Sequence, residues 1–413
     1  MINPIKAGLQ REPLRFFEII FLSLMLLSLP SLEAPKNIFL AAFIVTSIWR
    51  QFKTKLNWSL WDSIFLIYIS SAFLSALFAG FGPGDEWIGF RGMLFWSIFG
   101  WAVSRANYSS KEITWIFWLA ILSTLPPLVW GLIEYMVIHT KNSLQLHSVG
   151  HVNHSAIYLG IILGAALSGS LSVWPGKNLL KKLGLITLPI LFFIAIIIGQ
   201  SRGVFGVTLI RSSLIILMIP NSKKIKILAF TIFAIVLSLM PVMHSDIIEK
   251  QQASQNNNNI LSDRNRVWAA GIEAARIYPF LGIGNGNYHY ITPDKIQASV
   301  ESRGDVYNPD HYLTNSHGHN LYIMAFVERG ILGLMALLIF MGGWLFVIIK
   351  NYSVLKKSEQ GSYLWGASLS AWIITCGVGF VNSTFHHEHA ILALLFLGLH
   401  LGFMQYHDKI KVR

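Results

Sequence analysis

Apolar runs of about 20 residues recur along almost the whole chain, with short polar segments between them. Twelve such runs lie near residues 16–33, 37–49, 58–79, 89–104, 113–138, 154–174, 183–199, 203–219, 227–242, 319–349, 362–383 and 390–406. A helix needs a run of this length to cross the hydrocarbon core of a bilayer. Charged residues make up only 13% of the chain, against about 25% in a soluble domain. The sequence therefore predicts an all-α polytopic membrane protein with about 12 transmembrane helices.

The lysines and arginines are distributed unevenly between the two sides of these predicted helices. With the N-terminus in the cytoplasm, the cytoplasmic segments hold 20 of the 32 basic residues. The short outer segments hold only Lys36, Arg91, Lys141 and Arg202. This bias follows the positive-inside rule and places both termini in the cytoplasm. The basic residues that give the net charge of +12 lie in short clusters beside the predicted membrane helices. Nucleic acid is therefore not the expected partner.

One polar segment is much longer than the others and runs from about Met243 to Gly318. Loops of this length are usually functional in compact proteins. We expect three regions: residues 1–242 with transmembrane helices 1–9, residues 243–318 as a long periplasmic loop with short helices, and residues 319–413 with helices 10–12. The N-terminal run is interpreted as a retained first helix because no convincing signal-peptide cleavage site follows it.

Basic residues on the outer side oppose the charge bias at two places. Arg202 lies between the seventh and eighth predicted helices, and Arg264 and Arg266 lie in the first turn of a helix that Ser262 or Asp263 could cap. The helix dipole disfavours cations there, but a bound anion reverses that cost. Arginine grips phosphate oxygens bidentately, which favours an anion site. Interfacial snorkelling or a solvated helix start remain the plain alternatives.

Two further segments border the last part of this long loop. Residues 279–288 are rich in glycine but have neither P-loop nor GxGxxG spacing, and we interpret them as a tight turn. From His319 to Ile349, an apolar helix would be about 46 Å long at 1.5 Å per residue. It must project from the bilayer or break near Gly330 and Gly333. A neutral His319 could accept a proton from an attacking hydroxyl.

Other polar residues have plainer interpretations. His386, His387 and His389 are too close together in sequence to converge on one ion, so no metal site is predicted. His147, His151 and His154 are expected to pack at the membrane interface. Arg211 lies within a predicted helix, where it is costly unless it is paired or faces a cavity, and Glu134 and Glu328 are the possible partners.

Together these motifs resemble the O-antigen ligase family. Its most specific mark is a His-Asn pair, nine residues and Gly-x-x-Gly, which here reads His319-Asn320, then Gly330-x-x-Gly333. Tyr322 and Glu328 lie within this string. Ser201-Arg202-Gly203 is similar to the family's outer arginine, and Ser262-x-Arg264-x-x-x-Trp268 to its loop arginine. The resemblance covers about residues 195–345, and elsewhere it rests on topology alone.

The resemblance implies a GT-C-like glycosyltransferase of the Gram-negative inner membrane with a periplasmic active site. It implies metal-independent, inverting transfer of a glycan from undecaprenyl pyrophosphate to lipid A–core oligosaccharide, without a cofactor. Arg202 and Arg264, or Arg266 in its place, would bind the pyrophosphate, and His319, or His317, would be the catalytic residue. Asn320, Tyr322, Trp268 and Glu328 would support them. The chain has no Asp-x-Asp motif of the kind that holds Mg²⁺ in many nucleotide-sugar enzymes.

Three alternatives remain at this point. A protein O-oligosaccharyltransferase usually has an extra C-terminal domain, whereas this sequence ends about seven residues after its last predicted helix. O-antigen polymerases share the fold but usually lack the His-Asn string. A transporter or lipid flippase would need charges near the middle of the membrane, where only Arg211 fits. The sequence leaves open the glycan, the core sugar and the oligomeric state.

Overall fold

The computed structural model describes residues 12–53, 57–146, 149, 151–174, 178–238, 263–355 and 358–411, and within these residues it is helical with no strand. The helices along the first half are α2 (Pro13–Ser28), α3 (Glu33–Phe52), α4 (Leu60–Leu77), α5 (Glu86–Arg105), α6 (Ser110–Leu122), α7 (Leu125–Met136), α8 (Val152–Val173), α9 (Leu179–Ile198), α10 (Arg202–Met218) and α11 (Lys223–Ser238). They are followed by α14 (Arg264–Ile277), η1 (Asn287–Tyr290), α15 (Pro293–Glu301), η2 (Pro309–His311), α16 (Leu321–Leu355), α17 (Glu359–Val378) and α18 (His387–Lys411).

Every one of the twelve predicted spans overlaps a helix of the structure. The fifth span contains two helices, α6 and α7, because two prolines follow Leu125 at the start of α7. Six helical segments in the described residues are long and apolar enough to cross a membrane. They are Leu60–Leu77, Ser110–Met136, Val152–Val173, Leu179–Ile198, Leu321–Ser353 and His387–Gln405. The chain is thus a multi-pass membrane protein, and the number twelve stays a prediction.

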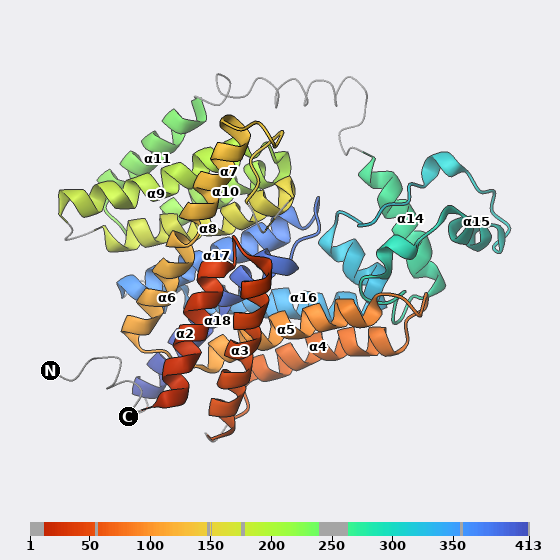
Figure 1. The fold of residues 1–413 in the computed structure, drawn as a ribbon, viewed down its shortest axis with the longest axis horizontal. Coiled ribbons are helices and arrows are strands. Elements are labelled where there is room, and N and C mark those ends of the chain that lie inside the picture. The colour runs from red at the N-terminus through yellow and green to blue at the C-terminus, as the bar shows by residue number, and fades with distance from the viewer. Residues whose placement is uncertain are drawn as a thin grey trace.

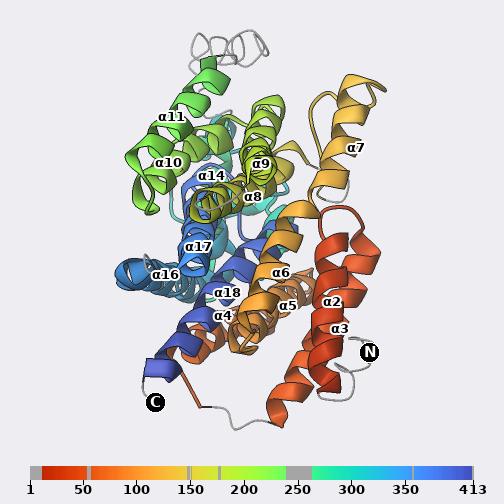
Figure 2. The ribbon, with the colours of Figure 1, turned by 90° about the vertical axis from the view of Figure 1, so that its left-hand side faces the viewer.

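Helices α8, α17 and α18 form the centre of the bundle, with α9, α10 and α11 on one side and α2 and α3 on the other (Figure 2). Small residues let α8 and α17 approach closely. A Cβ atom on Gly164 would lie 1.7 Å from Ser370 Oγ, and one on Gly366 would lie 2.3 Å from Ser168 Oγ. Close backbone approach at small residues is the usual way in which membrane helices associate. The close packing of α8 against α17 therefore depends on these four small residues.

Helices α14 and α15 lie together at one end of the bundle, on the right of Figure 1. Residues 263–320, most of which the sequence predicts to lie outside the membrane, are called the extramembrane unit and share a small apolar core with the start of α16. The buried Tyr288 donates a hydrogen bond from its hydroxyl to the Val267 carbonyl at 2.9 Å. Glu273 of α14 accepts hydrogen bonds from Ser299 and Arg303 of the α15 region. These contacts hold α14 against the η1 and α15 regions of the same unit.

The long helix α16 breaks at Gly330, which has φ 63° and ψ −165°. This confirms the prediction of a break near Gly330. The backbone groups that the break frees bind the segment that follows α14: Ile331 N donates to the Pro279 carbonyl at 2.8 Å, and Ile283 N donates to the Val327 carbonyl at 3.0 Å. The break therefore joins α16 to the extramembrane unit without leaving these groups unpaired.

The glycine-rich segment 279–288 packs directly on this break. Gly282, Gly284 and Gly286 all have positive φ, which agrees with the predicted turn. A Cβ atom on Gly282 would lie 2.4 Å from the Glu328 carbonyl carbon, and one on Gly330 would lie 2.2 Å from the carbonyl carbon of Phe280. Only glycine fits these two positions, since both the backbone conformation and the space exclude a side chain.

We expect Gly330→Ala to destabilise the protein by at least about 2 kcal/mol, because it adds a backbone clash to an unfavourable φ. Gly342→Ala in the same helix is the matched control, since a Cβ there meets nothing within 4 Å. Thermal unfolding in detergent, followed by size-exclusion chromatography, would compare them. Equal melting temperatures for the two variants would contradict this account of the break.

Candidate active site

The first turn of α14 faces the loop that carries His317 and His319. Arg264 begins the helix, and Trp268 follows on the same face one turn later. The indole Nε1 of Trp268 donates a hydrogen bond to the Gly318 carbonyl at 2.9 Å. Asp263 stands at the N-cap position in a left-handed conformation and its side chain makes no capping hydrogen bond, while Ser262 lies outside the described residues. Because Arg264 lies one turn before Trp268 on the same face of α14, the arginine also lies on the side of the helix that faces this loop.

His319 is held by fixed neighbours on both sides. Gly318 packs against Tyr288 and Met324, so a Cβ there would lie 2.9 Å from the Tyr288 ring. Asn320 accepts hydrogen bonds at its Oδ1 from the backbone N–H groups of Tyr322 and Ile323, as an N-cap of α16 does. Its Nδ2 donates to the Phe380 carbonyl at 2.9 Å, which fastens the loop to the end of α17. His319 itself has φ 47°.

The imidazole of His319 lies among charged and polar groups from three elements. Burial lowers the pKa of His319, the charge of Arg264 lowers it further, and a side-chain hydrogen bond with Asn382 raises it. Asn315 Nδ2 lies 3.5 Å from His319 Nε2. The ring is therefore neutral at ordinary pH and able to accept a proton. Asn382, between α17 and α18, was not foreseen from the sequence, which placed it near the end of the apolar run 362–383.

Arg202 and Arg264 are 62 positions apart in sequence but interact electrostatically in the folded chain. Arg202 is the first residue of α10, and its N-cap Ser201 donates a hydrogen bond to Asn153 of α8 at 2.9 Å. Burial lowers the pKa of Arg264, and the charge of Arg202 lowers it as well. Two guanidinium groups that repel one another, beside a helix N-terminus, form a site suited to a multivalent anion.

The other arginine of this motif points elsewhere. Arg266 Nη2 donates to the Pro309 carbonyl at 3.4 Å, and its Nη1 lies 4.0 Å from Asp263 Oδ1. The Arg266 carbonyl accepts a hydrogen bond from Leu313 N. Arg266 thus holds the η2 region against α14, whereas the charge of Arg264 reaches both Arg202 and His319.

Tyr322 and Glu328, the two supporting residues on α16, contact the scaffold. The Tyr322 hydroxyl donates to the Cys376 carbonyl at 3.0 Å, and its ring lies 4.8 Å from that of Phe380. Glu328 is partly buried two residues before the break, and its carboxylate interacts with the backbone of Gly286 and Tyr288. Nine residues separate it from His319, or about 13 Å along a helix. Its contacts are with the glycine-rich segment.

A group of histidines extends the site towards the bundle. The ring centre of His154 on α8 lies 4.9 Å from that of His386 and 5.4 Å from that of His389. Burial lowers the pKa of His386, and the neighbouring histidines lower it further. Within the described residues no group of three or more His, Cys, Asp or Glu side chains is arranged to hold a metal. His147 lies outside the described residues.

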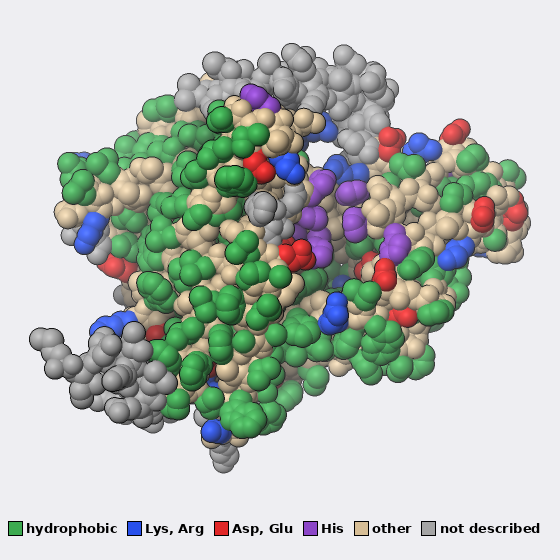
Figure 3. All heavy atoms as spheres, in the orientation of Figure 1, with side chains coloured by type: hydrophobic (Ala, Val, Ile, Leu, Met, Phe, Trp, Pro, Cys, Tyr) green, Lys and Arg blue, Asp and Glu red, His purple; other side chains and the backbone are tan. Residues whose placement is uncertain are grey.

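Figure 3 shows histidine side chains gathered on this face, between the extramembrane unit and the helical bundle. His317 is on the exposed side of this group. Burial lowers the pKa of His317, and the charges of His387, His289 and His151 lower it further. Of the two candidate histidines, only His319 has Arg264 and Asn382 among its electrostatic neighbours.

Arg211 is not paired with either expected partner. Its side chain is fully buried in α10, and none of its three nitrogen atoms has a hydrogen-bond partner in the described part of the chain. A Cβ on Gly164 of α8 would lie 2.3 Å from Arg211 Nη1, so this glycine makes room for the guanidinium. The proposed pairing with Glu134 or Glu328 was wrong, because Glu328 faces the glycine-rich segment and no ion pair joins Arg211 to either.

Trp268→Phe is expected to lower the rate of the reaction at this site about tenfold while changing unfolding stability by only about 1 kcal/mol. The substitution keeps the ring but removes the hydrogen bond that joins α14 to the His319 loop. Steady-state kinetics together with thermal unfolding would separate the two effects. A loss of stability above about 3 kcal/mol, or unchanged kinetics, would instead mark Trp268 as a general structural residue.

Fold and site define a multi-pass membrane protein with two arginines and a histidine at one end of its helical bundle. Residues 188–338 match the family model described as O-Antigen ligase. Residues 188–338 are therefore similar to the O-antigen ligase domain, which confirms the resemblance for this part of the chain. The match includes Arg202, Arg264, His319 and the break at Gly330.

The chain is also similar to a curated protein, the exopolysaccharide production protein ExoQ of Rhizobium meliloti (strain 1021). The two are 24% identical over 175 residues, which are 42% of this chain and 36% of the relative. The matched part therefore spans about a third of that protein's length.

Proposed function

We propose that this protein transfers a glycan from undecaprenyl pyrophosphate to lipid A–core oligosaccharide at the periplasmic face of the inner membrane. The observation that carries the proposal is the interaction of Arg264 with both Arg202 and His319. In this proposal the anion site lies beside a neutral base, and both fall within the residues that match the O-antigen ligase model. The region 243–318 would be the periplasmic loop, and the two flanking regions would form the membrane domain.

In this proposal Arg202 and Arg264 bind the pyrophosphate of the donor. The acceptor hydroxyl attacks the anomeric carbon, the bond from that carbon to the pyrophosphate oxygen breaks, and undecaprenyl pyrophosphate leaves. Attack from the face opposite the leaving group inverts the anomeric configuration. The arginines stabilise the charge that develops on the leaving oxygen, a contribution that such preorganised groups commonly make. The charge stabilisation needs no metal, since the two guanidinium groups supply it.

His319 takes the proton of the acceptor hydroxyl in the same step and later releases it to solvent. One ring nitrogen must be free to accept this proton, and a hydrogen bond from the other ring nitrogen to the Asn382 amide oxygen would select that tautomer. Asn320, Trp268 and Tyr322 position the loop through their contacts with Phe380, Gly318 and Cys376. Arg266 keeps the η2 region in place and Glu328 the glycine-rich segment.

The test uses purified protein in nanodiscs with an undecaprenyl-pyrophosphate glycan and lipid A–core, without nucleotide and with a chelator. We expect glycosylated core to form, and transfer to be lost in His319→Ala and Arg264→Ala. A requirement for added divalent metal would contradict the metal-independent reaction. Directional transport of the lipid-linked glycan without any transfer would favour the transporter or flippase.

The similarity to an exopolysaccharide production protein favours a second candidate within the same class. In it the acceptor is another lipid-linked glycan, so that the product is a polymer still attached to undecaprenyl pyrophosphate. The same arginines and histidine would serve, since only the acceptor differs. Formation of a ladder of longer lipid-linked glycans in the absence of lipid A–core would select this candidate, and transfer to pilin would select a protein O-oligosaccharyltransferase.

A further inference from the structure

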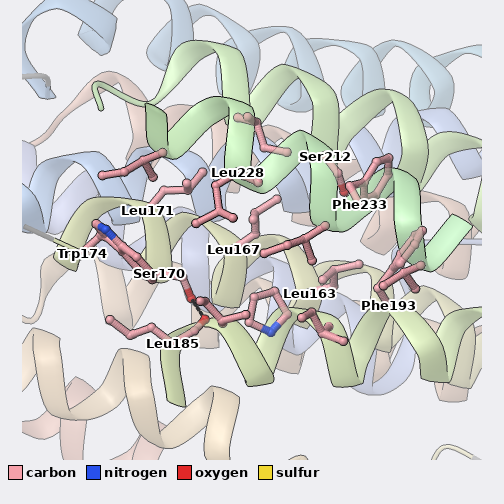
Figure 4. A pocket seen from close by; sticks show the side chains of 18 residues that line it. Leu163, Leu167, Ser170, Leu171, Trp174, Leu185, Phe193, Ser212, Leu228 and Phe233 are labelled. Carbon is pink, nitrogen blue, oxygen red and sulfur yellow. Dashed lines mark hydrogen bonds between the residues drawn. The ribbon is translucent and has the colours of Figure 1, made fainter. Parts of the chain in front are cut away.

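An apolar groove lies between α8, α9, α10 and α11, far along these helices from Arg202. It is an open groove with a cavity volume of about 90 Å³, lined almost entirely by apolar side chains. Leu163, Leu167 and Leu171 of α8 form one wall, and Phe193 of α9 and Phe233 of α11 close it at one end (Figure 4). Its lining contains no charged residue. The groove therefore suits a hydrocarbon chain.

The length of the groove matches one half of a bilayer. Its lining on α8 extends from Leu163 to Trp174, which is 11 residues or about 16 Å of helix. The hydrocarbon core is about 30 Å thick, so each leaflet contributes about 15 Å. A fatty acyl chain of one leaflet has this reach. An undecaprenyl chain, with its eleven isoprene units, is far longer than the groove.

Lysines surround the end of the groove at Trp174. Lys182 Nζ lies 5.5 Å from the centre of the Trp174 ring, and Lys226 Nζ donates to the Leu217 carbonyl beside the groove residue Ile216. Lys181, Lys223 and Lys224 lie in the same first turns of α9 and α11 and are exposed. These five residues are the basic rim of the groove.

The basic rim has no protein counter-charge. No aspartate or glutamate occurs between Glu134 and Asp246, a stretch that includes all four helices of the groove. None of the ion pairs in the described residues includes a lysine of the rim. Clusters of lysine beside membrane helices attract anionic lipid headgroups. The charge of the rim and the apolar lining of the groove thus both favour an anionic lipid.

From the groove and its rim we infer that this protein binds an anionic phospholipid, with one acyl chain in the groove and the headgroup among the five lysines. The bound lipid belongs to the leaflet at the starts of α9 and α11. It fills the space beside Ser212 and Ile216 of α10, the helix whose opposite end begins with Arg202. The inference is independent of the proposed glycan transfer, since the groove and the arginines lie at opposite ends of α10.

Native mass spectrometry of delipidated full-length protein, titrated with phosphatidylglycerol or phosphatidylcholine, tests this inference. We expect phosphatidylglycerol to bind at least tenfold more tightly than phosphatidylcholine. Ala229→Trp fills the groove and is expected to weaken phosphatidylglycerol binding at least tenfold. Ala234→Trp, on the exposed face of the same helix and outside the groove, is the matched control and is expected to bind as the wild type does.

A second set of variants probes the rim without altering the groove. Glutamine at Lys181, Lys182, Lys223 and Lys224 is expected to abolish the preference for phosphatidylglycerol, whereas glutamine at the exposed Lys53 and Lys111 is expected to preserve it. Equal binding of both lipids to the wild type, or unchanged binding in both Ala229→Trp and the rim variant, would overturn the inference. So would displacement of phosphatidylglycerol by an equimolar polyprenyl phosphate, which would make the groove an isoprenoid site.

Discussion

Replacing Arg264 by alanine is expected to lower kcat for glycan transfer about 10²–10³-fold, with a much smaller change in KM. Arg264 is the residue whose charge reaches both the second arginine and the candidate base. Its removal takes away charge stabilisation that grows as the bond to the pyrophosphate breaks. Steady-state kinetics with the lipid-linked donor and a core acceptor would measure the effect.

Arg266→Ala is the matched control for this variant, because both arginines lie in the first turn of α14 and carry the same charge. Arg266 contacts Pro309 and Asp263, so we expect its loss to lower kcat less than about fivefold. Arg264→Lys should recover only part of the activity, since an ammonium group cannot bind a phosphate bidentately. A large loss in Arg266→Ala with little loss in Arg264→Ala would transfer the pyrophosphate role to Arg266.

The positions of the helices could be predicted from the sequence because each apolar run is long and is interrupted by polar residues or proline. The break in α16 was also predictable, since its apolar run is longer than a bilayer requires. What fills the break was not predictable. It depends on hydrogen bonds between residues 279–284 and residues 327–332. These two segments are distant in sequence and meet only in the folded chain.

The charge pattern predicted an orientation but did not explain its exceptions. Lys36 was counted on the outer side against the bias, and the structure pairs it with the buried Glu388 of α18. A buried lysine needs such a partner, because an unpaired charge would be costly there. The two residues are 352 positions apart, so no local pattern could have indicated the pair. Asn382 and His319 are also distant in sequence, 63 positions apart, so no local pattern indicated their contact either.

The search for a partner of Arg211 failed for a related reason. Sequence reasoning looked for a carboxylate, whereas the structure packs the guanidinium against Gly164 and near Ser370. The glycine could have been noticed, because Gly160, Gly164 and Ser168 recur on one face of α8 at helical spacing. In the candidate site, by contrast, the individual motifs already named Arg202, Arg264 and His319, and the fold brings their segments together.

His319→Ala is expected to lower kcat about 10²–10⁴-fold, because transfer then proceeds without a positioned base. His317→Ala is the control from the same loop. His317 is exposed and lacks the contact with Asn382, so its loss is expected to cost less than about tenfold. Kinetics in nanodiscs, with folding checked by size-exclusion chromatography, would compare the two. The opposite order of losses would make His317 the base.

The pH dependence of the reaction gives this assignment a signature that a structural histidine would lack. The base acts in its neutral form, so the rate falls as the pH drops through the pKa of His319. Burial and the charge of Arg264 lower that pKa, whereas Asn382 raises it. The acid limb of the pH–rate profile should therefore move to higher pH in Arg264→Ala and to lower pH in Asn382→Ala. Shifts in the same direction, or none in either variant, would show that another group titrates in the rate-limiting step.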